Sequence, residues 1–588
     1  MKWDLTNYYK TYDDFIKSLE EAKKIIEILK TYKGTLGDEL KLKEYLDYQI
    51  DIVGKYEKLY LYAECAMDID QRNTSALSDM QKVMFLFNSM SEATSFEDSE
   101  ILSLGEDYIL SVINKYSELK QFEFGLKNLF RQKEHTPKEE AQKVIANFSS
   151  LLRSGSDTYD SLSNGDIKEH IIKLDNGKDV NIMDANWSTL IAESKSAKER
   201  ERIFEAEFER YEYNKNTYAS LYKSVLNADI GLAKSRGFKS ALEMHLYHNN
   251  IPLSLYHNLI EIAHKAAPTV KKYLALRKKV LGLDEYHTYD RFLDLVEDEN
   301  ESKFTYEEAK ELFFKSIEKF PQEFKNNAKE ALKDGYVDVM PGLGKRSGAY
   351  SNSTANTHPC ILLNFTGNLD SCFTLAHEAG HSIHSLFSMA QPTMTQSYTI
   401  FVAEIASTFN EHNLLDYLLS KGTLSKNEKI KLIQNAIDGI ISTFYRQTQF
   451  AEYEYLAHKK ALEGEAITED SLSNIFIKLY DEYYGIDINK EKVKKYVWAY
   501  VSHFFHSPYY VYQYATSYSA SLAIYNKVKN NEEGAFEKYI NLLKSGGSDY
   551  PIELVKKAGV DFTKTDALDA VVIRLEELLE ELGKAINE

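Results

Sequence analysis

The chain has few of the residues that interrupt helices or cross-link loops. Only 9 of its 588 residues are proline, the first being Pro137, and 26 are glycine. Because proline disrupts a helix interior, this scarcity favours long helices. The three cysteines, Cys65, Cys360 and Cys372, are too few and too irregularly spaced for a disulfide framework, and they suit a reducing compartment.

Positive charge is in deficit, and long apolar runs are missing. Lys and Arg number 71 against 90 Asp and Glu, a net charge of −19. Sequence-independent nucleic-acid binding needs a basic surface, so we expect no nucleic-acid partner. No run approaches about 18 apolar residues, so we expect no membrane span. Asp4 also stands where a signal peptide would be apolar. We predict a cytoplasmic protein, whose oligomeric state the sequence does not give.

Apolar residues recur at helical spacing along most of the chain. The pattern is clear in residues 15–29 and 42–60, and it returns in residues 186–334 and from residue 371 to the C-terminus. The sequence therefore predicts a mainly α protein. We divide it into an N-terminal helical region, residues 1–185, and a catalytic domain, residues 186–588.

Two short stretches depart from the helical pattern. Apolar residues alternate on both sides of Asn176-Gly177, which predicts a β-hairpin over residues 172–182. A Gly-rich segment, residues 337–367, contains the apolar run 359–365. We interpret this run as a strand. Because it begins at Pro359, which cannot donate to a ladder, we expect it at the edge of a sheet.

A metal-binding pattern follows this strand directly. His377 and His381 are four residues apart on a predicted helix that Asp370 or Ser371 would cap, so both imidazoles project from one face. Two imidazoles so placed can share one zinc ion. Glu378 stands between them, positioned to take a proton from a zinc-bound water. This is the HExxH arrangement of zinc peptidases; the alternative is two surface histidines on a helix.

A catalytic zinc ion needs a third protein ligand. His384 lies about 10 Å along the helix from His377, too far to share an ion, so we expect it to pack or to support a ligand. Glu404 lies in a mostly apolar helical stretch, where a carboxylate is costly to bury without a cation. Glu411, two turns further on, could orient one of the histidines. The alternatives are a Glu404 at the rim of its helix and an exposed Glu411.

The segment from His377 to Ser385 resembles the signature of the oligoendopeptidase F and thimet oligopeptidase family. The resemblance extends over residues 186–566, with its firmest agreement in residues 347–350, 361–364, 403–408, 446–451 and 503–516. It implies a two-lobed helical body with a deep substrate channel, a small β-sheet beside the HExxH helix, and endopeptidase action on short peptides.

The resemblance also implies the roles of individual residues. One zinc ion per chain would be bound by His377, His381 and Glu404, with Glu378 as the general base. Peptide substrates would lie antiparallel along the strand at residues 359–365, where backbone hydrogen bonds bind a peptide with little dependence on its sequence.

The family supplies oxyanion donors from a region that is rich in histidine and tyrosine here. A neutral imidazole or phenol can stabilise the charge that develops on the attacked carbonyl. We select His503, Tyr510 and Tyr514 for this role. Because the spacing differs from the thimet branch, His506 and Tyr512 stay open as alternatives.

The sequence thus predicts a zinc endopeptidase that cleaves internal bonds of oligopeptides. One alternative is a zinc carboxypeptidase or dipeptidyl carboxypeptidase. Such an enzyme needs a fixed cation to hold the terminal carboxylate, and no Arg or Lys stands out for this. The other is a non-catalytic peptide-binding protein, which an intact HExxH motif and Glu404 argue against.

Overall fold

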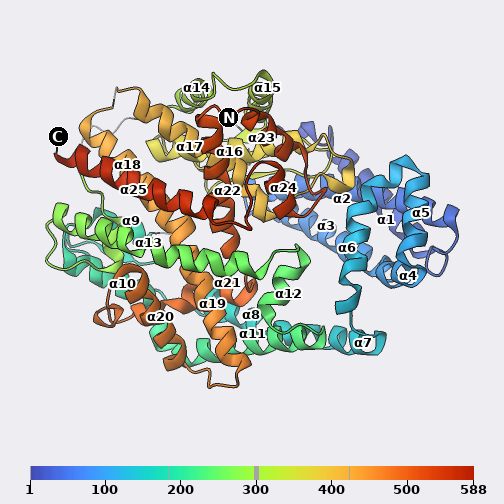
Figure 1. Ribbon diagram of the computed structural model, residues 1–588, viewed down its shortest axis with the longest axis horizontal. Coiled ribbons are helices and arrows are strands. Elements are labelled where there is room, and N and C mark those ends of the chain that lie inside the picture. The colour runs from blue at the N-terminus through green and yellow to red at the C-terminus, as the bar shows by residue number, and fades with distance from the viewer. Residues whose placement is uncertain (1, 185, 297–302, 423, 588) are drawn as a thin grey trace. The chain divides into compact units, whose positions relative to one another are not determined.

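The computed structural model describes residues 2–184, 186–296, 303–422 and 424–587 (Figure 1). The predicted mainly α fold is confirmed, since helices account for most of these residues and the strands are short. None of the helices described has the length and hydropathy needed to cross a bilayer. The three cysteines are buried thiols, in line with the predicted lack of a disulfide framework.

The chain divides into two compact units, each built from three segments. Unit 1 comprises Met1–Glu134, Asn300–Gly422 and Ala520–Asp561, and unit 2 comprises His135–Glu299, Thr423–Ser519 and Phe562–Glu588. The predicted boundary after residue 185 coincides with no limit of either unit. The division into an N-terminal helical region and a catalytic domain therefore stays a prediction.

Unit 1 begins with the helices that the apolar spacing predicted. The helix α1 starts one residue after Thr11, which forms a capping box with Asp14. Helices α1, α2 and α3 pack against one another (Figure 1). The helices of this unit are α1 (Tyr12–Lys30), α2 (Glu39–Ile69), α3 (Thr74–Ala93), α4 (Glu97–Leu104), α5 (Glu106–Lys115), α6 (Glu123–Gln132), α14 (Tyr306–Ser316), α15 (Gln322–Ala331), α16 (Leu369–Ser388), α17 (Ile400–Ser420), α23 (Ala535–Lys544) and α24 (Pro551–Lys557).

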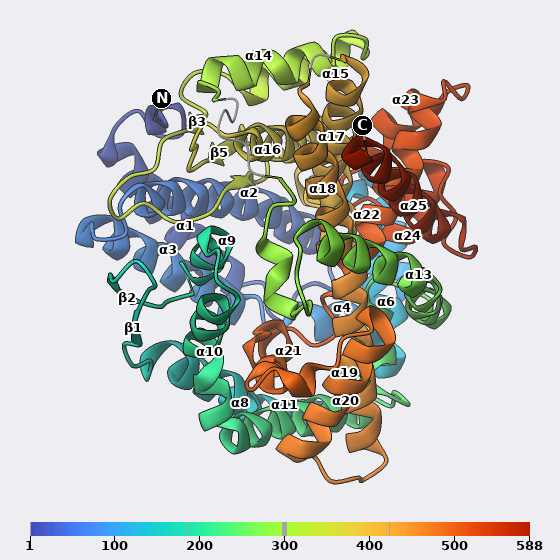
Figure 2. The ribbon, with the colours of Figure 1, turned by 90° about the vertical axis from the view of Figure 1, so that its left-hand side faces the viewer.

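A three-stranded sheet lies beside α16 in unit 1 (Figure 2). Its order is β3 (Val337–Asp338), β5 (Cys360–Leu362), β4 (Tyr350–Asn352). The strand β5 runs parallel to β3 and antiparallel to β4, and Ile361 faces Val337 on one side and Ser351 on the other.

The expectation of an edge strand at residues 359–365 is therefore wrong. The strand is central. It pairs with β4 on one side, and on the other side its backbone bonds β3 and the residues next to β3. For example, Ile361 N–H donates to the carbonyl of Tyr336, which directly precedes β3, at 2.9 Å. Pro359 precedes β5, so its missing N–H interrupts no ladder. A peptide cannot pair with β5, because both sides of this strand are occupied. Of the two strands that flank β5, β4 is the one that lines the cavity described below.

Unit 2 contains the predicted hairpin, which is confirmed. Strands β1 (Ile171–Lys173) and β2 (Asp179–Asn181) are antiparallel, and Gly177 has φ +85° in the turn, a conformation that favours glycine. The helices of this unit are α7 (Glu139–Asn147), α8 (Ser149–Asp160), α9 (Trp187–Glu193), α10 (Ala197–Tyr213), α11 (Lys215–Ser235), α12 (Ala241–His248), α13 (Leu253–Val280), α18 (Lys426–Ile440), α19 (Arg446–Leu462), α20 (Glu469–Tyr484), α21 (His503–His506) and α25 (Asp566–Asn587). The helix α22 (Tyr512–Lys529) contains the boundary between the units.

Candidate active site

The HExxH motif lies in the third and fourth turns of α16. Asn368 caps this helix by accepting a hydrogen bond from Ser371 N at 2.9 Å, so the cap stands before the predicted Asp370 or Ser371. Gly367, with φ +84°, makes the turn into the cap, and a Cβ there would lie 2.9 Å from the Phe304 carbonyl oxygen. The turn between β5 and α16 therefore requires glycine.

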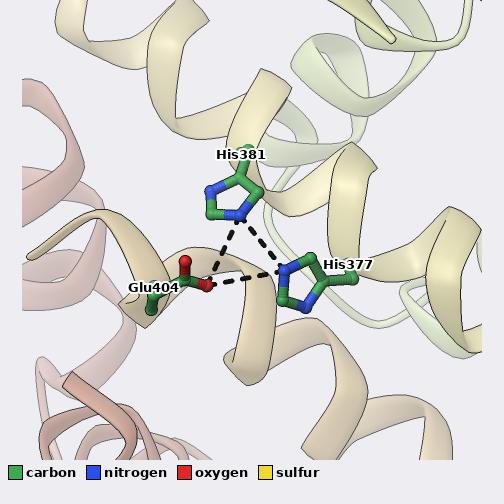
Figure 3. Close-up of side chains that lie close together, drawn as sticks. All are labelled: His377, His381 and Glu404. Carbon is green, nitrogen blue, oxygen red and sulfur yellow. Dashed lines mark hydrogen bonds and ion pairs between the residues drawn. The ribbon is translucent and has the colours of Figure 1, made fainter. Parts of the chain in front are cut away.

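The structure brings together the three predicted metal ligands (Figure 3). The Nε2 atoms of His377 and His381 are 3.2 Å apart, and Glu404 Oε2 lies 3.4 Å from the first and 3.5 Å from the second. Two atoms that each lie about 2.0–2.1 Å from one tetrahedral zinc are roughly 3.3–3.4 Å apart. The donor set and its spacing therefore fit zinc.

Glu411 holds one of these histidines, as the sequence predicted. His377 Nδ1 donates to Glu411 Oε1 at 2.5 Å, which leaves Nε2 as the nitrogen that faces His381 and Glu404. Ser407 Oγ donates to Glu404 Oε2 at 2.9 Å. Sequence reasoning did not predict that Ser407 would hold the Glu404 carboxylate. The position of Ser407 one turn after Glu404 on the same helix could have indicated this contact.

The electrostatics of the site favour a cation. Burial disfavours a charged His377, but Glu411, Glu378 and Glu404 outweigh this effect and raise the pKa of His377 to about 10. Burial would likewise raise the pKa of Glu404, but His381 and His377 lower it to about 2. The carboxylates thus create a negative field at the point where the three ligand atoms converge.

Glu378 is a buried carboxylate with an unsatisfied oxygen. Its side chain is 6% exposed, and among the described residues Oε2 has no hydrogen-bond partner. Burial raises the pKa of Glu378. Together with His377, His381 and Glu404 it lines a cavity of about 520 Å³, to which Tyr350 and its neighbours in β4 also belong. An acceptor left bare in a cavity is placed to take a proton from a bound molecule.

His384 packs against a neighbouring ring and is not part of the candidate metal-binding group. Its ring stacks on Tyr398 with centroids 3.7 Å apart, and burial lowers its pKa to about 3. This agrees with the expectation that it is too far along the helix to share an ion with His377.

Gly380 sets the distance between α16 and α17, the helix that carries Glu404. A Cβ at this position would lie 2.5 Å from the Ala406 carbonyl oxygen and 2.6 Å from Ser407 Cα. Since real Cβ atoms do not approach backbone so closely, α17 would have to move. The glycine inside the HExxH motif is therefore needed for Glu404 to lie close to the two histidines.

Replacing Gly380 by alanine should lower the thermal stability and weaken zinc binding. Overpacking of this kind costs about 1–3 kcal/mol, and the shift of α17 carries Glu404 away from the histidines. Thermal unfolding with and without zinc measures both effects. Gly125→Ala is the matched control, because Gly125 lies in α6 with nothing within 4 Å of an added Cβ. Equal unfolding temperatures for the two variants would contradict the packing argument.

The predicted oxyanion donors lie together in unit 2. The rings of His503 and Tyr510 have centroids 5.8 Å apart, and those of Tyr510 and Tyr514 are 5.7 Å apart. Burial, assisted by His506, lowers the pKa of His503, so its imidazole is neutral near pH 7 and can act as a hydrogen-bond donor.

The alternatives at this position face other partners. His506 Nε2 lies 3.0 Å from Asp160 Oδ1, and the Tyr512 ring is buried against Tyr256 with centroids 5.4 Å apart. Between them Tyr509 has φ +57°, and its N–H donates to Glu454, a fully buried carboxylate, at 3.0 Å. Sequence reasoning missed Glu454, whose apolar helical surroundings resemble those that identified Glu404.

A second group of potential ligands lies in unit 2. His264, Glu452 and Glu482 place ligand atoms within 4.8 Å of one another. Glu452 Oε2, however, already accepts from the Tyr483 hydroxyl at 2.7 Å and lies 2.8 Å from His264 Nε2. These two contacts explain why the three side chains lie close together: they belong to a hydrogen-bond network.

Comparison with known proteins relates the whole chain to one family. Residues 190–572 match Peptidase family M3, and residues 100–168 match Oligopeptidase F. Oligopeptidase PepF of Bacillus subtilis (strain 168) is 36% identical over 99% of this chain and 87% of the relative. Group B oligopeptidase PepB of Streptococcus agalactiae serotype III (strain NEM316) is 33% identical over 100% of this chain and 97% of the relative.

The fold agrees with this assignment. The crystal structure of oligoendopeptidase-F from Enterococcus faecium matches with a TM-score of 0.77 and 29% identity, over 98% of this chain and 99% of that chain. The chain belongs to peptidase family M3 and its oligopeptidase F group, and it is a metallo-oligopeptidase.

Proposed function

We propose that the protein is a zinc-dependent endopeptidase of short peptides, in which His377, His381 and Glu404 hold one zinc ion per chain. The observation that carries the proposal is the spacing of 3.2–3.5 Å among the three ligand atoms. When bound, zinc polarises a peptide carbonyl and makes a water molecule acidic at neutral pH.

Glu378 is the general base of this reaction. Its unsatisfied Oε2 accepts a proton from the attacking water, and the same carboxyl then gives that proton to the leaving amine. The raised pKa of Glu378 suits both steps, since the group must hold the proton between them. Glu411 keeps the His377 ring oriented throughout.

His503, Tyr510 and Tyr514 stabilise the negative charge that develops on the carbonyl oxygen. Their clustering in unit 2 and the lowered pKa of His503 support the role, because the neutral imidazole and the phenols donate hydrogen bonds.

The peptide binds as an added strand along β4, in place of the strand first expected at residues 359–365. Support comes from the position of β4 beside β5, and from the cavity that β4 shares with Glu378. Ser351 and Ser353 attach this stretch to α16 through Ser382 at 2.8 Å and Ser385 at 2.6 Å. Backbone pairing accepts many sequences, as an oligopeptidase requires.

Digestion of a decapeptide blocked at both ends, read by mass spectrometry, tests the proposal. We expect internal cuts that a chelator abolishes and added zinc restores. N-methylation of alternate backbone amides should slow cleavage by removing donors to β4. Cuts at a fixed distance from a free C-terminus alone would favour a carboxypeptidase. Lack of chelator-sensitive cleavage would favour a non-catalytic peptide-binding protein. A cytoplasmic location stays a prediction.

A further inference from the structure

Unit 2 contains a cavity of about 840 Å³, and His503 is the one residue of the proposed mechanism among those that line it. Its volume is in the range of ligand sites in proteins. The walls come from α8, α10, α19, α20 and the segment from Lys494 to His503. A π-helical turn, Ile441–Tyr445, leads directly into Arg446 at the cavity wall, and such turns are frequent at functional sites.

The walls are strongly aromatic. Side chains that line the cavity include Trp187, Phe204, Phe208, Phe292, Phe450 and Tyr480. Faces of this kind bind apolar or aromatic side chains of a ligand.

Lys494 is a buried cation in this cavity. It is 8% exposed, and its ammonium lies 4.8 Å from the centroid of the Tyr480 ring and 5.7 Å from that of Phe204. Within the described parts of the chain, no hydrogen bond or ion pair reaches Lys494 Nζ, and the buried carboxylate of Glu491 attracts it only at longer range. An ammonium removed from bulk water without a directly bonded acceptor is costly, and the aromatic rings and the more distant Glu491 compensate only in part.

Arg446 is a second cation that makes no direct ion pair among the described residues. No hydrogen bond or ion pair reaches its guanidinium, and its Nε is buried. The acids of the cavity wall have other partners or lie outside: Asp160 is 3.0 Å from His506, Asp184 accepts from Tyr500, and Glu169 is exposed. Two cations that make no direct ion pair among the described residues thus line one cavity in a chain of net charge −19.

We propose that this cavity is a subsite for a carboxylate of the peptide substrate, with Lys494 and Arg446 as its cationic partners and the aromatic walls receiving the adjoining apolar side chain. The inference rests on the proposed peptidase function. His503, one of the proposed oxyanion donors, also lines the cavity. Guanidinium and ammonium groups form charge-assisted hydrogen bonds with carboxylates.

The carboxylate can be the C-terminus or an acidic side chain, and four peptides of one sequence distinguish these sources. They carry an internal glutamate or glutamine and a free or amidated C-terminus. We expect one of the two carboxylates to raise kcat/KM of the wild-type protein about 10- to 100-fold over the doubly neutral peptide. Lys494→Met and Arg446→Met should each remove most of this gain.

Lys495→Met is the matched control, because Lys495 is the next residue in the chain but does not line the cavity. In this variant the carboxylate should raise kcat/KM as much as it does in the wild-type protein. The affinities of the same four peptides for the Glu378→Gln protein, measured by calorimetry, give the same comparison without cleavage. Equal affinity and equal kcat/KM for all four peptides with the wild-type cavity would overturn the subsite. A gain retained in both cavity variants would also overturn it. If zinc-loaded wild-type protein cleaves none of the peptides, the proposed function fails, and the binding comparison still decides the subsite.

Discussion

Glu378→Gln is expected to remove most of the cleavage of a quenched peptide while leaving zinc bound. The amide keeps the shape of the side chain but cannot accept the proton of the attacking water. General-base catalysis contributes roughly 10²–10⁴-fold, so kcat should fall by about that factor. Zinc content should stay at one equivalent, because Glu378 is not among the three converging ligands. Metal analysis and initial rates on the same preparation measure both results.

Glu378→Asp provides the graded comparison for this prediction. It keeps a carboxylate but withdraws it by about one bond length, so some activity should survive, more than in Glu378→Gln. Cleavage by Glu378→Gln at the wild-type rate would contradict the role of Glu378 as general base. Loss of zinc from that variant would show that Glu378 acts on the metal site and not on the proton.

The local part of the site could be predicted from the sequence. Residues four apart in a helix share a face, so the spacing of His377 and His381 was sufficient to predict that their imidazoles converge. Glu404 was identified because a carboxylate in an apolar helix needs a cation, and its Oε2 lies 3.4 Å from His377 Nε2. Even the helix start was wrong by only a few residues, since Asn368 provides the cap.

The non-local part could not be predicted. The strand β5 is central because β3, only two residues long, pairs with residues 24 positions further along the chain. So short a strand leaves no pattern in the sequence. The need for glycine at position 380 depends on where the backbone of α17 passes. Whether Lys494 has a counter-ion likewise depends on residues distant in the chain, so the sequence shows only one more lysine.

Glu404→Gln is expected to lose the metal and, with it, all cleavage. An amide carbonyl carries no net charge and is a poor zinc ligand beside the carboxylate it replaces. The substitution also removes the negative charge of the carboxylate whose Oε2 lies 3.4 and 3.5 Å from the Nε2 atoms of His377 and His381. We expect zinc affinity, measured by competition with a chromophoric chelator, to fall more than about 100-fold, beyond the range of about 10–100-fold that supporting residues give.

Glu411→Gln is the control that separates a ligand from its support. Both glutamates lie on α17 and both face His377, but Glu411 bonds Nδ1 and Glu404 faces Nε2. Glu411→Gln keeps an acceptor for Nδ1–H and loses only its charge. Its zinc affinity should therefore fall by about 10–100-fold, less than that of Glu404→Gln. Wild-type affinity in Glu404→Gln, or a larger loss in Glu411→Gln, would exclude Glu404 as the third ligand and leave the two histidines in need of another partner.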